Sequence, residues 1–399
     1  MLYPDLESDY SEGTNFNFLL NESSKRLSLC KVSINEHCKA ETPAGTFIEY
    51  TVVTEMDSST YIVRRRYSDF DWLMIYLHQK YPLYILPPIP PKRIFTAIDK
   101  FSRSFINKRM KALERMMHRL SYLKTCLEDT KTQAFLKYHQ REFDLFRKEH
   151  KNYSFIKKLS VSLVRVYDDT IYSFNGENAC AMKDESTLKC FEIFYKRITE
   201  RTVLLSMLNS LESISDEWEI FSFALLWTAQ NVADVVLMTE KSEITGILDG
   251  VAQLFFNWST ETKLRFHSLT ETINPFINEY IAYDNQIIEI IRERNNTKTN
   301  LGMKKRQIFS MQSQLSSEKF NSLPRGNKYD QLMTFSIKLE DQLTDFDRIF
   351  YPSYSDWQIQ KSRDIAHCMN VIVETNITYH KSCLDMCKDL LNKILNNQI

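Results

Sequence analysis

Three short runs of β-branched or alternating residues lie in the first part of the chain and predict a small antiparallel sheet. The runs cover residues 27–34, 46–54 and 60–67. A polar stretch at 37–45 separates the first two runs and predicts the connection between them. Residues 1–25 are polar and acidic and have no hydrophobic period, so we expect a disordered tail there.

Helices are predicted to follow the sheet and to complete an α+β unit. Ser68 and Asp69 supply helix-start chemistry ahead of apolar positions at helical spacing. Dense proline over 86–92 predicts an extended polyproline segment, because proline fixes φ and removes a hydrogen-bond donor. Helices are expected over about 69–80, 101–123 and 132–138.

Beyond residue 186 the chain carries three long stripes of apolar residues. In the middle stripe these residues step by three or four from Ile244 to Ile291, far past the usual helix length of about 11 residues. Only a coiled coil or a bundle buries such stripes. We therefore expect an all-α region of three antiparallel helices, of roughly 45, 75 and 70 residues.

The segment 155–174 predicts a strongly amphipathic helix between the two regions. At about 100° per residue its bulky apolar side chains fall on one face, and Lys157, Lys158 and Arg165 fall on the opposite face. Such a helix either packs on its own protein or lies in a membrane interface, and both alternatives stay open.

Composition narrows the classes of function. Only 7 glycines occur in 399 residues, which disfavours the glycine-rich loops that cradle phosphates in nucleotide-binding enzymes. Walker, HExxH and Gly-x-Ser-x-Gly patterns do not occur, so we expect no enzyme, no catalytic residue and no cofactor. Cys383 and Cys387 have a spacing that can share a metal, but without a second pair they favour buried thiols and no metal site.

Charge is distributed unevenly along the chain, although 51 basic and 51 acidic residues cancel. Residues 61–125 carry 14 basic side chains against 4 acidic ones, which indicates a site for an anion. The neutral total disfavours a nucleic-acid partner. The longest nearly apolar run, 221–227, is far shorter than the roughly 20 residues that cross a bilayer, so no transmembrane segment is expected. The 8 cysteines and the polar N-terminus indicate a reducing compartment.

Three motifs in sequence order carry a resemblance to a known family. They read Arg-Arg-Arg-Tyr-Ser-Asp-Phe-Asp-Trp-Leu at 64–73, Leu-Pro-Pro-Ile-Pro-Pro-Lys at 86–92, and Phe-Ile-Asn-Lys-Arg-Met-Lys-Ala-Leu at 105–113. Together they resemble the phox-homology (PX) domain of the sorting nexins. With the amphipathic segment and the three long helices, the chain resembles the PX-BAR sorting nexins, and most of all the branch containing sorting nexins seven and thirty. The resemblance implies a PX domain over 26–145, a linker helix over 153–175 and a BAR domain over 183–399.

Several residues in these motifs are suited to an inositol phosphate. Arg66 offers a planar fork that can grip a phosphate, and Ser68 opens a helix whose free N–H groups attract an anion. The resemblance implies phosphatidylinositol 3-phosphate as the ligand, with Arg66 and Ser68 at the 3-phosphate and Tyr67 beneath the ring. It also implies Lys92 at the 1-phosphate and Arg109 at the 4- and 5-hydroxyls.

Two other interpretations of these motifs stay open. Three successive arginines on a strand are ordinarily a solvated edge. The proline segment could instead bind an SH3 domain.

Two further sets of side chains are candidates for contact with acidic lipid. One set belongs to the amphipathic segment, and the other lies near the end of the middle helix, where a merely solvated tip is the alternative. They are Phe155, Lys157, Lys158, Leu159, Leu163 and Arg165, and Arg292, Arg294, Lys298, Lys304, Lys305 and Arg306.

The resemblance implies a peripheral membrane protein of the cytoplasm, on the cytosolic face of early or recycling endosomes. It implies cargo sorting at curved membranes, with autophagy as a further process, and a homodimer or a heterodimer with another PX-BAR sorting nexin. The alternative is a helical protein–protein scaffold whose PX fold does not bind lipid.

Overall fold

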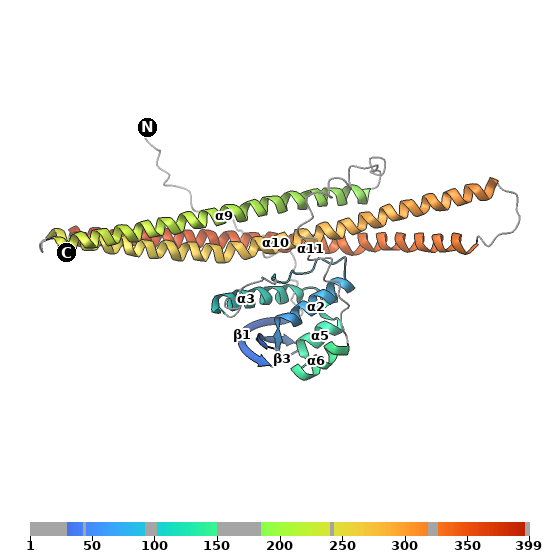
Figure 1. The fold of residues 1–399 in the computed structure, drawn as a ribbon, viewed down its shortest axis with the longest axis horizontal. Helices are drawn as coiled ribbons and strands as arrows, with labels where there is room; N and C mark the ends of the chain where they lie inside the picture. Colours follow the sequence, from blue (N-terminus) through green and yellow to red (C-terminus); the bar gives the residue numbers. More distant parts are fainter. Residues whose placement is uncertain are drawn as a thin grey trace, which may run out of the picture. The chain divides into compact units, whose positions relative to one another are not determined.

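The computed structural model describes residues 30–42, 45–91, 102–149, 185–239, 243–317 and 326–395. The chain divides into two compact units (Figure 1). One unit comprises residues 1–81 and 89–153, and the other comprises residues 82–88 and 154–399. The tail expected over 1–25 and the linker helix expected over 153–175 lie outside the described residues.

The first unit contains a three-stranded antiparallel sheet with the strand order β1-β2-β3. The strands are β1 (Lys31–Thr42), β2 (Gly45–Met56) and β3 (Ser59–Arg66). Asp57 and Ser58 join β2 to β3 with φ angles of 50° and 62°, the left-handed conformation that a two-residue hairpin turn requires. The predicted sheet is confirmed, although β1 extends through 37–42, where a connection was expected.

Five helices accompany the sheet in the described part of this unit. They are α2 (Tyr67–Lys80), α3 (Arg103–Leu120), α4 (Lys124–Leu127), α5 (Thr130–Lys137) and α6 (Gln140–Glu149). Phe70, Phe135 and Phe143 are fully buried, and successive rings meet edge to face at 5.0 and 6.0 Å. This aromatic core holds α2, α5 and α6 together and thereby anchors the junction between β3 and α2.

Three long helices build the second unit: α9 (Glu185–Met238), α10 (Glu243–Ser317) and α11 (Gly326–Leu395). They have 54, 75 and 70 residues, and each runs back along the one before it (Figure 1). Their core includes Tyr280 and Ile287 of α10 with Phe346 and Phe350 of α11. The predicted α+β unit followed by three long antiparallel helices is confirmed, and α9 is longer than expected.

A buried ion pair crosses the core of the helical unit. Arg197 of α9 donates a hydrogen bond to Asp284 of α10 at 3.0 Å, and both side chains are buried. The guanidinium carbon also lies 5.0 Å from the centre of the Trp357 ring. Burial raises the pKa of Asp284 to about 6, and the charge and hydrogen bond of Arg197 oppose that shift. The pair links α9 to α10 at a position that an apolar stripe does not predict.

The short segment Pro82–Pro88 belongs to the helical unit. Ile85 is buried in the helical core, and its amide donates to the Ser353 hydroxyl at 3.0 Å. The Gln286 side chain donates to the carbonyl oxygen of Tyr84 at 3.1 Å. Residues 82–88 are thus grouped with the helical unit, although they fall within the range 26–145 that the resemblance implies for the PX domain.

Helix α9 carries an unusually apolar surface. It contains an 18-residue window with a mean hydropathy of 1.5, of which 17% is buried, so by length and composition alone it is apolar enough to cross a membrane. No such segment is expected from the sequence, in which the longest nearly apolar run is 221–227. However, α9 packs along α10, where Ser259 donates a hydrogen bond to the carbonyl oxygen of Ser222 at 2.7 Å. The exposed side chains include Ile220, Phe221, Phe223, Trp227, Val235, Leu237 and Met238.

Candidate functional site

The three arginines at the end of β3 have three different environments, because successive side chains on a strand point to opposite faces. Arg64 is exposed, Arg65 is fully buried, and the Arg66 side chain is 38% exposed. Arg65 donates to the carbonyl oxygens of Arg64, Ala134, Phe135 and Tyr138. Its guanidinium carbon lies 4.0 Å from the centre of the Phe143 ring. Arg65 is therefore part of the core, whereas the Arg66 side chain reaches solvent at the junction.

Arg66 caps the start of α2. Its amide donates to Oδ2 of Asp69 at 2.9 Å, and its guanidinium carbon lies 5.4 Å from the centre of the Phe47 ring. Ser68 follows in the first turn of α2 and is exposed. Because the first N–H groups of a helix have no partner within the helix, the exposed hydroxyl and the Arg66 fork surround a place suited to an anion.

Tyr67 and Arg109 stack on each other at the same junction. The guanidinium carbon of Arg109, on α3, lies 4.5 Å above the centre of the Tyr67 ring and 4.3 Å from that of Phe105. Burial raises the pKa of Tyr67, so its hydroxyl stays protonated and donates to the carbonyl oxygen of Pro90 at 2.6 Å. Burial also raises the pKa of Tyr50, and Arg109 opposes this shift through its charge and a hydrogen bond. One face of the Tyr67 ring is thus covered by a cation.

The structure brings together four of the five predicted pocket residues. Arg66, Tyr67 and Ser68 are consecutive at the junction, and Arg109 joins them from α3 through its contact with Tyr67. Lys92 lies outside the described residues. Phe47 and Arg147, which contact this site, were not predicted from the sequence, because each reaches the junction from an element distant in the chain.

The basic residues near the end of α10 are less available than their sequence indicates. Arg294 is only 6% exposed and donates to the hydroxyls of Ser186 and Thr187 of α9. It therefore serves the interior of the helical unit, and the interpretation of Arg294 as a membrane contact is corrected. Lys298 contacts Thr187 as well.

The other four cations of this set are closer to solvent. Arg292 donates to Glu289 at 2.8 Å, and Lys305 pairs with Glu340 at 2.6 Å. Lys304 is half-buried and Arg306 is exposed. The six candidates on the amphipathic segment, Phe155, Lys157, Lys158, Leu159, Leu163 and Arg165, lie outside the described residues.

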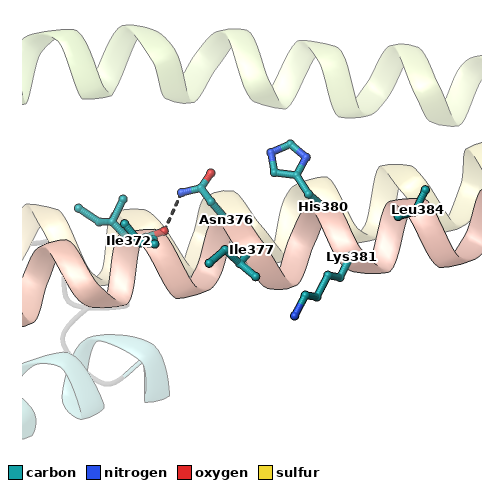
Figure 2. A pocket seen from close by; sticks show the side chains of 7 residues that line it. Ile372, Asn376, Ile377, His380, Lys381 and Leu384 are labelled. Atoms are coloured by element: carbon teal, nitrogen blue, oxygen red, sulfur yellow. Dashed lines mark hydrogen bonds between the residues drawn. The ribbon is translucent and has the colours of Figure 1, made fainter. Parts of the chain in front are cut away.

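A shallow apolar strip runs along α11 (Figure 2). It is lined by Ile372, Val373, Asn376, Ile377, His380, Lys381 and Leu384. Asn376 donates to the carbonyl oxygen of Ile372 at 2.7 Å and accepts from Arg265 of α10, so it is held in place by the helices themselves. Val373, Ile377 and Leu384 are each about half exposed, and Ile377 and Leu384 belong to the apolar stripe that predicts α11. Within the described residues, part of that stripe is therefore exposed.

Comparisons with known proteins agree with this architecture. Residues 53–139 match the PX domain family. Mouse sorting nexin-7 is 23% identical over 351 residues, which cover 86% of this chain and 83% of the relative. Zebrafish sorting nexin-30 is 23% identical over 381 residues, covering 92% and 79%. The cryo-EM structure of the SNX-BAR Mvp1 tetramer shares the fold, with a TM-score of 0.55, 16% identity, and coverage of 90% of this chain and 100% of that one.

The chain carries a PX domain followed by a long helical region, and over most of its length it is similar to the PX-BAR sorting nexins. The relatives that it matches include sorting nexin-7 and sorting nexin-30, the branch that the resemblance in the sequence implies.

Proposed function

We propose that this protein binds phosphatidylinositol 3-phosphate at the junction of β3 and α2. The observation that carries the proposal is the approach of two guanidinium groups from different elements to one helix start. Arg66 has a partly exposed fork beside the exposed Ser68, and Arg109 lies against the Tyr67 ring. The 3-phosphate would contact Arg66 and Ser68, and the inositol ring would lie near Tyr67 and Arg109, with Lys92 at the 1-phosphate.

We further propose that two chains associate through the helical unit, either as a homodimer or with another PX-BAR sorting nexin. The exposed apolar side chains of α9 and the strip on α11 support association, because large apolar patches are seldom left in water. Two lipid sites on one dimer would raise the apparent affinity for a membrane through effective concentration. Cations near the end of α10, the half-buried Lys304 and the exposed Lys305 and Arg306, would add attraction to acidic lipid.

The resulting role is that of a non-enzymatic peripheral protein that sorts cargo on curved endosomal membranes. Its expected location is the cytosolic face of early or recycling endosomes, and autophagy is a further process that such recruitment could serve. The relatives named sorting nexin-7 and sorting nexin-30 support the trafficking role.

Vesicle flotation tests the proposal with a matched pair of variants. The full-length protein is mixed at physiological salt with vesicles that contain either phosphatidylinositol 3-phosphate or an equal amount of the 4-phosphate isomer. We expect flotation with the 3-phosphate only, its loss in Arg66→Ala, and its retention in Arg64→Ala, which removes the same charge from the exposed face of β3. Absence of flotation with both vesicles, together with capture of a protein by the helical unit, would favour the protein scaffold instead.

A further inference from the structure

Asp69, in the first turn of α2, is a buried carboxylate with several arginines around it. Its Oδ2 accepts from the Arg66 amide at 2.9 Å. Its Oδ1 contacts Nη1 of Arg147 and lies 3.5 Å from Nε of Arg66. Arg65 also interacts with Asp69 through its charge, but its guanidinium nitrogens donate to backbone carbonyl oxygens. Among the described residues, Asp69 therefore has two direct cationic partners, Arg66 and Arg147.

Arg147 and Arg66 interact with the Asp69 carboxylate to different extents. Arg147, in the last turn of α6, makes the direct contact with the carboxylate, from a position 78 residues further along the chain. Arg66 Nε is buried and, within the described residues, forms no hydrogen bond, while more than a third of the Arg66 side chain faces solvent. Because Arg147 already balances the charge of Asp69, the fork of Arg66 is left to meet an external anion.

We propose that Arg147 is a positioning residue for the lipid phosphate. It neutralises Asp69 and so prevents that carboxylate from drawing the Arg66 guanidinium onto itself. Without Arg147, a buried carboxylate would hold Arg66 as its only close cation, and a bidentate Arg–carboxylate pair competes directly with a bidentate Arg–phosphate pair. This inference rests on the proposed binding of phosphatidylinositol 3-phosphate, and it adds a residue of the last helix of the α+β unit to that site.

Calorimetric titration of the full-length protein with water-soluble dibutanoyl phosphatidylinositol 3-phosphate tests the proposal. Arg147→Gln should weaken binding by about tenfold, the lower end of what loss of a charge-assisted contact costs. Arg141→Gln is the matched control, since it removes an exposed arginine from the same helix and should change the affinity by less than about twofold. Circular dichroism of each variant establishes that it is folded.

The double variant Asp69→Asn/Arg147→Gln separates positioning from a purely structural role. Asparagine keeps an oxygen for the Arg66 amide but carries no charge, so the double variant should regain affinity to within about threefold of wild type. Failure of the second substitution to restore binding in a folded protein would overturn the inference, as would unchanged affinity in Arg147→Gln. Wild-type protein that does not bind the lipid would overturn the proposed function, and the inference with it.

Discussion

Substitution of Arg65 by methionine keeps a long side chain at the centre of the arginine run but removes a guanidinium group that donates to four carbonyl oxygens. Those carbonyls belong to β3, α5 and the residue that ends α5, so the side chain ties the last helices to the sheet. Burial lowers the pKa of Arg65 to about 10, which still leaves the group charged at neutral pH. The variant should therefore destabilise the α+β unit, and it should affect lipid binding only through that loss of stability.

The expected loss of stability in Arg65→Met follows from the burial of the guanidinium group. A single hydrogen bond to a charged donor contributes about 1.5–3 kcal/mol, but the contacts are not additive and the free charge is well hydrated in the unfolded chain. Loss of one member of a buried charged network costs about 3–5 kcal/mol. At 1.36 kcal/mol per factor of ten, the slowest amides of the unit should exchange about 10²- to 10⁴-fold faster.

Hydrogen–deuterium exchange of the full-length protein, followed by peptide mass spectrometry, measures this effect in the α+β unit alone. Peptides from β3, α2, α5 and α6 should lose protection in Arg65→Met. Arg64→Met is the control and should stay within about 0.5 kcal/mol of wild type, because the Arg64 side chain is exposed. Unchanged protection in Arg65→Met, combined with a loss of lipid binding equal to that of Arg66→Ala, would refute the assignment of Arg65 to the core.

Three further predictions address other parts of the chain. Ser68→Glu should weaken binding of soluble phosphatidylinositol 3-phosphate by at least about tenfold, because a negative charge would stand where the phosphate binds. Ser68→Ala is the control and should not weaken binding to that extent. Equal titration curves for Ser68→Glu and wild type would contradict this prediction. Burial raises the pKa of the Cys126 thiol to about 12, so at pH 8 iodoacetamide should label the exposed Cys387 and leave Cys126 unlabelled. Equal labelling of the two cysteines in a mass spectrum would contradict this prediction. Arg197→Met should lower the free energy of unfolding by about 3–5 kcal/mol, because it leaves Asp284 buried without its partner. Burial raises the pKa of Asp284 to about 6, and Arg197 opposes that shift, so without Arg197 the carboxyl should take up a proton more readily. The stability lost in Arg197→Met, measured by thermal unfolding, should therefore be smaller at pH 5.5 than at pH 7.5. An equal loss of stability at both pH values would count against this prediction.

Local pattern predicts most of the fold but not the burial of Arg65 in β3. Hydropathy alone would bury Ile62 and expose Arg65, whereas the structure leaves Ile62 59% exposed and buries Arg65. Pairing of Arg65 with Tyr50 places both side chains in the core, and the acceptors of Arg65 come from residues some 70 positions later. A contact that depends on the packing of α5 and α6 leaves no periodic signal in β3.

The candidate site is likewise predicted only in part from the sequence. Arg66, Tyr67, Ser68 and Arg109 stand in motifs that can be read from the sequence, and the structure assembles them at one junction. Arg147 stands in no motif, and it reaches Asp69 only because α6 packs beside α2. In the basic run on α10, the interpretation of Arg294 as a membrane contact is wrong for the same reason, whereas contact of Lys304, Lys305 and Arg306 with acidic lipid stays a proposal.

Cations in that run look alike in sequence. Only the approach of Ser186 and Thr187 from α9 reveals that Arg294 faces inward.

The central claim, that the β3–α2 junction with Arg109 forms the lipid pocket, is tested most directly by a footprint of the bound ligand. Hydrogen–deuterium exchange of the full-length protein is compared with and without saturating dibutanoyl phosphatidylinositol 3-phosphate. The account predicts new protection in peptides that contain the first turn of α2 and the Arg109 region of α3, and no change in α9 or in the basic end of α10. Saturable binding with protection confined to the helical unit, and none at the junction, would contradict it.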